Sequence, residues 1–322
     1  MQSEFFFSTI NEDLNSLNYN LQNMVGAKHP ILHASSEHIF SAGGKRIRPA
    51  IILLVSQATL NNYIIHTEHK RLAEITEIIH TASLVHDDII DEGLTRRGVT
   101  TVHSIFSTKI AVLAGDFLFA QSSWYLANLH NLEVVKTISK VIIDFAEGEI
   151  RQGLIIFDST MSMNQYVEKS FYKTASLIAA SCKSASILSQ VILEQQNACY
   201  LYGKHLGLAF QIIDDILDII GSIKSLGKPS SSDLKNGNLT APILFALTES
   251  QELQNLINKE FEDKEDIKCA ILLIYNSKGL QKAKDLAEEH IQIAINSVQF
   301  AADYKIYKNL VFIGQYILER LY

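Results

Sequence analysis

A short aspartate-rich pattern, DDxxD, occurs twice in the chain, and its residue types and spacing could do chemistry. The copies are Asp87, Asp88 and Asp91, and then Asp214, Asp215 and Asp218. On an α-helix such positions fall within an arc of about 100°, so each copy directs three carboxylates to one side. Like charges on one helix face repel one another. A hard cation such as Mg²⁺ removes that repulsion, with water and phosphate as its other ligands.

A single DDxxD could equally be a solvated face of a helix. Two copies, each set among apolar residues, favour the metal-binding interpretation. We therefore predict two acidic patches that face each other across a cavity and hold a polyanionic substrate through several Mg²⁺ ions.

Basic residues occur where a phosphate-binding role is plausible. Gly43-Gly44 is followed by Lys45, Arg46, Arg48 and Pro49. A glycine pair lets the backbone approach a ligand closely, and lysine and arginine side chains suit a phosphate group. The alternative is a solvated basic turn. Neither interpretation is excluded by the stretch alone.

Two arginines and one histidine lie close to the first aspartate motif in the sequence. Arg96 and Arg97 follow it in the loop 92–98, where they either neutralise its carboxylates or hold a second anion. His80 precedes Asp87 by seven residues and so occupies nearly the same helix face two turns away. It is predicted to contact a ligand, the alternative being an ordinary core or surface histidine.

Lys173 and Thr174 lie near the start of a stretch rich in alanine and serine that runs over residues 166–193. Small residues let helices pack closely, which is the commoner reason for such a composition. A lysine inside a helical bundle requires an anionic partner, so Lys173 is expected to have one.

The elements that position these residues are predicted to be helices. Apolar residues recur at intervals of three and four rather than two, and no strand pattern competes. The expected helices cover 3–24 and 70–91, begin at Pro30, at Gly115 and at Thr240, and include 200–220, which ends at Gly221. Residues 249–322 show amphipathic helices without a chemical motif. We predict an all-α fold over one domain, 1–322, around a central cavity.

Composition excludes several classes of protein. The net charge of −7 argues against a nucleic-acid-binding protein, because no basic face can be inferred. No apolar run is long enough for a transmembrane segment, and Met1–Ile10 carries Glu4 without the basic residues of a signal or transit peptide. Cys182, Cys199 and Cys269 lack metal-ligand spacing and indicate buried free thiols. We expect a soluble protein in a reducing compartment.

From about Gly43 to Pro242 the chain resembles the trans-isoprenyl diphosphate synthases. The motifs that carry the resemblance occur in the order GGKRIRP, the first DDxxD, RRG, GDF, the Lys-Thr pair, FQIIDDILD and GKP with a later aspartate. The resemblance implies the all-α isoprenoid synthase type I fold and a homodimer. It also implies a reaction that joins isopentenyl diphosphate to an allylic diphosphate and releases diphosphate.

The resemblance further implies a role for each matched residue. The carboxylates would hold three Mg²⁺ around the allylic diphosphate, with Asp87, Asp91 and Asp214 as ligands and Asp88, Asp215 and Asp218 in support. Contacts to the same diphosphate would come from Arg96, Lys173 and Lys228. The diphosphate of isopentenyl diphosphate would be held by Lys45, Arg48, His80 and Arg97. Thr174 and Gln211 would face the developing carbocation.

Two residues depart from the family pattern of the last loop, and a third feature concerns product length. Ser231 stands where the family usually has glycine and Asn238 where it usually has lysine, which predicts weaker dependence on that loop. The turn before the first motif has Ala82 and Ser83 instead of the aromatic residues that limit the product in short-chain members. We predict a product of about C40–C45 for a quinone side chain.

Other interpretations remain open at this point. A shorter-chain geranylgeranyl synthase and a non-catalytic subunit of a heteromeric synthase both fit the same family. A His-Asp phosphohydrolase is suggested loosely by His80 with His86-Asp87, but leaves the second DDxxD unexplained. Terpene cyclases share the fold, although they usually lack the second DDxxD and the GGKRIRP turn. The composition, rich in Ile, Asn and Lys, suggests a bacterial cytoplasm or a plastid stroma.

Overall fold

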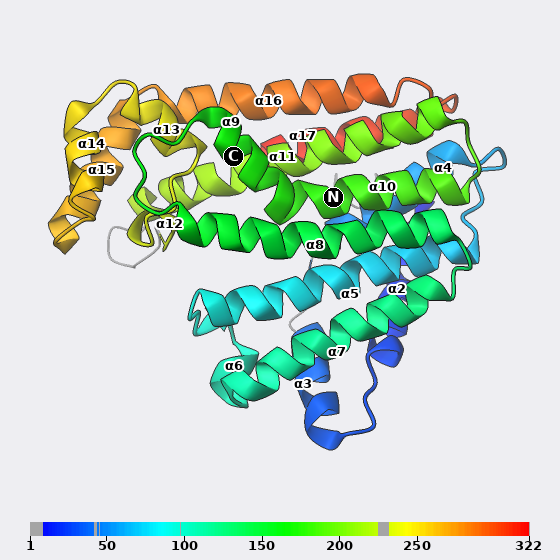
Figure 1. Cartoon of the computed structure of the whole chain (residues 1–322). Helices are drawn as coiled ribbons and strands as arrows, with labels where there is room; N and C mark the ends of the chain where they lie inside the picture. Colours follow the sequence, from blue (N-terminus) through cyan, green and yellow to red (C-terminus); the bar gives the residue numbers. More distant parts are fainter. Residues whose placement is uncertain (1–8, 42–43, 45, 97, 225–231, 322) are drawn as a thin grey trace. The chain divides into compact units, whose positions relative to one another are not determined.

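The structure is a computed structural model and describes residues 9–41, 44, 46–96, 98–224 and 232–321. Within these ranges the chain is mostly helical and has almost no strands, which confirms the predicted all-α fold (Figure 1). It divides into two compact units. Unit 1 comprises residues 1–140, 180–199 and 300–310, and unit 2 comprises residues 141–179, 200–299 and 311–322. A single domain over 1–322 stays a prediction.

Unit 1 is built around α5, whose last turn carries the first aspartate motif. Its elements are α2 (Asn11–Met24), α3 (Pro30–Ser41), α4 (Ile47–Thr59), α5 (Thr67–Ile90), β1 (Thr95–Arg96), β2 (Val99–Thr100), α6 (Val102–Ile105) and α7 (Thr108–Ala127). Helix α5 packs against α4 and α7, which lie beside it (Figure 1). Leu72, Ile75 and Ile79 are fully buried at helical spacing, so this core fixes the axis of α5.

Unit 2 contains the second aspartate motif. The elements wholly inside it are α9 (Met163–Ser170), the π-helix η2 (Phe171–Ala175), α12 (Ser232–Lys235), α13 (Ala241–Leu247), α14 (Gln251–Asn258), α15 (Lys264–Asn276) and α16 (Gly279–Ser297). The helices with residues in both units are α8 (Leu132–Leu154), α10 (Ser176–Leu188), α11 (Leu193–Lys224) and α17 (Tyr304–Glu319).

Several predicted helix boundaries are confirmed and others are wrong. Helix α3 begins at Pro30 as predicted, and Thr240 is the N-cap of α13. Gly115 does not open a helix, because it lies in the interior of α7. Gly221 does not end α11, which continues to Lys224. A single glycine lowers helix propensity by only about 1 kcal/mol, which tertiary packing overrides.

The prediction that no strand competes with the helices is also wrong in one place. The loop after the first aspartate motif forms an antiparallel hairpin in which Thr95 pairs with Thr100 and Arg96 with Val99. Gly98, with φ of +78°, lies in the hairpin turn, where a left-handed backbone favours glycine. Two residues per strand are too few to show an alternating sequence pattern.

Candidate active site

The first aspartate motif forms the end of α5. Asp87 and Asp88 belong to the last turn, and Asp91 is the C-cap, whose backbone N–H donates to the Asp87 carbonyl at 2.8 Å. Glu92 follows with φ of +51°, so the chain leaves the helical path there. The Gly93 N–H then donates to the Asp88 carbonyl at 3.0 Å. As a result Asp88 is partly buried, whereas Asp91 is exposed.

Arg96 neutralises one carboxylate of this motif. Its Nε donates to Asp88 Oδ1 at 2.7 Å. Burial raises the pKa of Asp88, and the charge of Arg96 opposes that rise. Arg96 and Arg97 were expected either to neutralise the carboxylates or to hold a second anion, and in the structure Arg96 neutralises Asp88. Arg97 lies outside the described residues.

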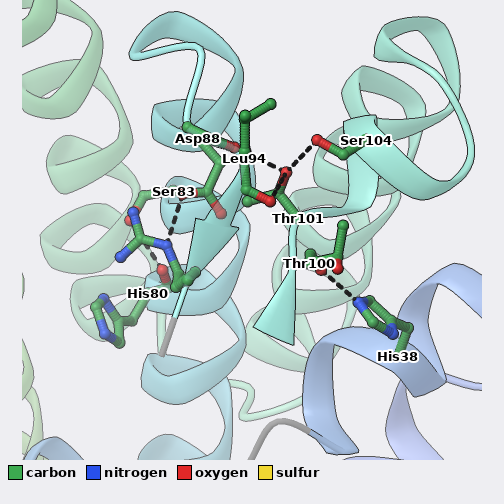
Figure 2. A network of polar contacts seen from close by, with 10 residues as sticks. His38, His80, Ser83, Asp88, Leu94, Thr100, Thr101 and Ser104 are labelled. Atoms are coloured by element: carbon green, nitrogen blue, oxygen red, sulfur yellow. Dashed lines mark hydrogen bonds and ion pairs between the residues drawn. The ribbon is translucent and has the colours of Figure 1, made fainter. Parts of the chain in front are cut away.

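The hairpin that carries Arg96 is held in place by polar contacts on both sides (Figure 2). The Thr101 hydroxyl donates to the Gly93 carbonyl at 2.8 Å and bonds the Ser104 hydroxyl at 2.9 Å. On the opposite side, His38 Nε2 on α3 donates to the Thr100 carbonyl at 2.8 Å. These bonds fix the hairpin against α3 and α6, so the position of Arg96 depends on tertiary structure.

The basic turn lies beside α5. Arg48 on α4 donates from its guanidinium to His80 Nε2 at 2.9 Å, so His80 accepts there. Arg46, with φ of +49°, forms a 2.5 Å ion pair with Glu77. His80 and Arg48 are therefore in contact, and their binding of a diphosphate stays a prediction. Lys45 and Gly43 lie outside the described residues.

Several of these side chains, but not Arg48, line an open pocket of unit 1. Its polar walls include Arg46, His80, Asp88 and Arg96, and Leu84 belongs to its apolar wall. It holds about 610 Å³ of empty space, the part open to solvent included. Arg46 and Arg96 are paired there with Glu77 and Asp88. A lining that mixes charged and apolar side chains suits a small molecule with a polar head and a hydrocarbon body.

His86, which directly precedes the first motif, has a packing role. Its Nε2 donates to the Val112 carbonyl on α7 at 3.2 Å. The imidazole lies so close to Gly115 that a Cβ at that position would overlap it. The glycine of the GDF motif therefore lets α7 approach α5. His86 does not join His80 in a metal site, and the described ranges contain no cluster of three metal-ligating side chains.

The second aspartate motif lies in α11 and has three different environments. Asp215 is buried and accepts from the Tyr166 hydroxyl at 2.5 Å and from Gln211 Nε2 at 2.8 Å. Burial, followed by the charge of Asp233, raises the pKa of Asp215 to about 8. The same two causes raise the pKa of Asp218 to about 7.

Asp214 is partly exposed and contacts the arginine that follows the C-terminal helix α17. Arg320 donates to Asp214 Oδ1 at 2.5 Å, and its guanidinium lies 4.4 Å from the centroid of the Phe210 ring. Residues 249–322 show no chemical motif in the sequence, so this arginine was not predicted. No local motif marks it, because its partner is 106 positions away.

Lys173 and Thr174 lie in the π-helix η2. The Ser176 N–H donates to the Phe171 carbonyl, the five-residue spacing of a π-turn. Thr174 Oγ1 donates to Gln211 Oε1 at 2.6 Å, so the structure brings this predicted pair together. Lys173 Nζ lies 3.3 Å from Glu149 and donates to Gln152 at 3.4 Å. Glu149 is the anionic partner that the sequence requires.

Close packing explains the small residues beside this π-turn. A Cβ at Gly207 on α11 would overlap the backbone of Ala175. Any side chain there would push α11 away from η2 and separate Thr174 from Gln211. The small-residue interpretation of the stretch is therefore consistent with a role in positioning the polar pair.

A further polar group of unit 2 is missed by the sequence analysis. Lys169 on α9 donates to Asn238 Oδ1 at 2.5 Å, and Asn238 Nδ2 donates to Asp233 Oδ1 at 2.8 Å. Lys169, Lys173, Gln211 and Asp215 line one pocket with Asn238. Lys228 and Ser231 lie outside the described residues.

Comparison with known proteins identifies the class. The polyprenyl synthetase family model matches residues 29–274. A prenyl transferase of Porphyra purpurea is 59% identical over 99% of both chains. The chloroplastic solanesyl-diphosphate synthase 2 of Oryza sativa subsp. japonica is 49% identical over 97% of this chain and 78% of its own.

A solved structure agrees with these relatives. The polyprenyl synthase of Caulobacter crescentus, complexed with calcium and isoprenyl diphosphate, superposes with a TM-score of 0.89 at 28% identity, covering 98% of this chain and 97% of the other. The fold and the matches define a trans-prenyltransferase of the all-α isoprenyl diphosphate synthase type. The chain belongs to the polyprenyl synthetase family. This family uses a divalent metal and isoprenoid diphosphate substrates.

Proposed function

We propose that the protein condenses isopentenyl diphosphate with an allylic diphosphate and releases diphosphate, building an all-trans polyprenyl diphosphate of about C40–C45 for quinone side chains. The observation that carries this proposal is the chain of contacts from Thr174 through Gln211 to Asp215. It links the Lys-Thr pair to the second aspartate motif in one unit. Relatives named solanesyl diphosphate synthase support the long product.

Mg²⁺ fits the donor set. The carboxylates of both motifs are hard oxygen donors, and Mg²⁺ is commonly bound by one or two carboxylates together with water and substrate phosphates. The ligands would be Asp87, Asp91 and Asp214, with Asp88, Asp215 and Asp218 in support, for about three ions. When bound, Mg²⁺ would stabilise the negative charge of the departing diphosphate.

The protein's own side chains would bind and orient the substrates. Arg48 and His80 would hold the diphosphate of isopentenyl diphosphate, and Lys45 and Arg97 would complete that set. Arg96, Lys173 and Lys228 would contact the allylic diphosphate. Cationic donors aimed at charge that develops as the C–O bond breaks lower the barrier, because they bind the transition state more tightly than the ground state.

Thr174 and Gln211 would face the carbocation. Each has an oxygen with lone pairs, and their mutual hydrogen bond fixes both side chains. A fixed dipole stabilises positive charge without the reorganisation that loose water would require. The apolar surroundings of η2 and α11 would exclude the water that could quench the cation.

Product length depends on the turn of α5 before the first motif. Ala82 is fully buried and Ser83 is partly buried, with its hydroxyl bonded to the His80 carbonyl at 2.9 Å. Neither side chain is bulky, which supports a long product over a geranylgeranyl one. Substituting Ala82→Phe should shorten the product, and an unchanged product length would refute this account.

The deciding experiment is a product assay on the purified protein with labelled isopentenyl diphosphate, farnesyl diphosphate and Mg²⁺. Products are dephosphorylated and sized by reverse-phase chromatography. A Mg²⁺-dependent series that ends near C40–C45 supports the proposal. A product that stops at C15 or C20 keeps the reaction and refutes the length. No product from the protein alone supports instead the subunit of a heteromeric synthase.

We also propose a homodimer formed through α7. Among the described helices, α7 alone is long and apolar enough to cross a membrane, a test that core helices of soluble proteins also pass. Its exposed residues Leu113 and Trp124 lie about three turns apart on the same helix face, which a second copy could cover. Substituting Trp124→Glu should then yield a monomer in sedimentation analysis.

A plastid or a bacterial cytoplasm is the proposed compartment, as algal and cyanobacterial relatives suggest.

A further inference from the structure

Lys169 is a partly buried cation of unit 2 to which the proposed function gives no role. Its Nζ donates to Asn238 Oδ1 at 2.5 Å and lies 5.9 Å from the centroid of the Tyr166 ring. An ammonium group has three N–H donors, so a single hydrogen bond leaves two available. Within the described ranges, Lys169 forms no salt bridge.

The carboxylates around Lys169 are engaged elsewhere. Asp215 accepts from Tyr166 at one oxygen and from Gln211 at the other. Asp233 Oδ1 accepts from Asn238. Lys173, which lines the same pocket, differs because Glu149 lies 3.3 Å from its Nζ. An ammonium group that has lost much of its water and lacks an ion pair is costly unless an anion compensates it.

We propose that Lys169 contacts the allylic diphosphate and stays with the diphosphate that leaves, while Asn238 orients its ammonium group toward the pocket. The inference rests on the proposed function and adds a substrate-contacting residue to it. Asn238 is neutral, so it positions the ammonium group without cancelling its charge. Asp233 holds the amide of Asn238 from the far side.

Because Lys169 Nζ and Asn238 Oδ1 are 2.5 Å apart, a positive charge at position 238 could replace the charge of Lys169. A lysine at position 238 would place its ammonium group in the same pocket, so Asn238→Lys should replace the charge that Lys169→Gln removes. Asn238→Lys with Lys169 retained puts two ammonium groups side by side, and repulsion between them should lower activity.

The experiment measures initial rates of the full-length protein with farnesyl diphosphate varied at saturating isopentenyl diphosphate and Mg²⁺, and inhibition by inorganic diphosphate. Lys169→Gln should raise the KM for farnesyl diphosphate and the inhibition constant of inorganic diphosphate by about ten- to a hundredfold, the range for loss of a charged hydrogen bond. The KM for isopentenyl diphosphate should change little. Lys169→Arg should retain most of the affinity.

The double variant Lys169→Gln with Asn238→Lys should recover much of the lost affinity. Lys282→Gln is the matched control, since it removes one positive charge from an exposed pair with Glu249 in the same unit. Unchanged constants in Lys169→Gln would overturn the proposal. So would equal losses for both substrates with a lowered melting temperature and no recovery in the double variant, because that pattern describes a structural lysine.

Failure of the proposed function is a separate result. If the wild-type protein forms no product, titration calorimetry with Mg²⁺ and inorganic diphosphate still tests Lys169. Binding by the wild type that weakens about tenfold or more in Lys169→Gln supports the anion contact. Equal binding by both proteins overturns it.

Discussion

The hydrogen bond between Tyr166 and Asp215 should stabilise the fold by an amount that depends on pH. Both residues are buried, and the Tyr166 hydroxyl donates to Asp215 Oδ2 at 2.5 Å. The substitution Tyr166→Phe removes this donor and little volume. The carboxyl group then keeps Gln211 as its other described hydrogen-bond donor.

The magnitude follows from the charge of Asp215. Its pKa is about 8 in the folded protein, against 3.8 for an ordinary aspartate. A raised carboxyl pKa means that the stability contributed by this group is fully present below about pH 4 and is lost as pH rises through about 8. Near pH 6 the group is protonated, so the substitution removes a neutral hydrogen bond worth about 1 kcal/mol. Near pH 9 it is ionised, so the loss should reach about 2–3 kcal/mol.

Urea denaturation followed by circular dichroism at both pH values measures the two losses. Tyr275→Phe, a substitution of an exposed tyrosine in α15, is the matched control and should change the free energy of unfolding by less than about 0.5 kcal/mol at either pH. The hydrogen bond from Tyr166 also lowers the pKa of Asp215. Tyr166→Phe should therefore raise this pKa further and move the pH at which stability falls upward. Equal losses at both pH values would refute the assignment of an ionised Asp215.

Three further predictions concern the metal, Arg320 and Gly115. Burial raises the pKa of Asp218 to about 7 and of Asp215 to about 8, so binding of Mg²⁺ with inorganic diphosphate should release protons. The affinity should therefore increase about tenfold from about pH 6 to about pH 8. Calorimetry in two buffers measures both effects, and a pH-independent affinity would contradict the prediction. Arg320→Gln should lower the Mg²⁺ concentration for half activity about two- to fivefold, because the partly exposed Arg320 no longer competes with Mg²⁺ for Asp214. The control Arg151→Gln should leave this concentration unchanged, and equal values for both variants would count against the prediction. Gly115→Ala should lower the free energy of unfolding by about 1–3 kcal/mol through overlap with His86, while Gly153→Ala, with open space around it, should be neutral or stabilising; equal melting temperatures would contradict the close approach.

The sequence predicted what is local. Helical spacing identified α5 and α11 around the two DDxxD motifs, and proline marked the start of α3. Arg48 with His80, and Thr174 with Gln211, were assigned to shared roles by resemblance, and each pair is in contact. The π-turn of η2 was not predictable, because it depends on how closely Gly207 lets α11 approach Ala175.

Contacts between distant positions account for most of what the sequence did not indicate. Arg320 meets Asp214 across 106 positions, and Tyr166 meets Asp215 across 49. Neither residue carries a local signal, because Tyr166 lies in the short helix α9 and Arg320 directly follows the end of α17. The hairpin after α5 depends likewise on His38 and Thr101 rather than on strand propensity.

Asn238 shows how a departure from a linear pattern changes meaning once its neighbours are known. In sequence it replaces a lysine, which predicts weaker dependence on that loop. In the structure its amide oxygen accepts from Lys169, which comes from α9, 69 positions earlier. The pocket therefore keeps a positive charge close to position 238. A charge needed by a substrate can be supplied from any element that lines its site, so the loss of one lysine is informative only after the other cations of the pocket have been located.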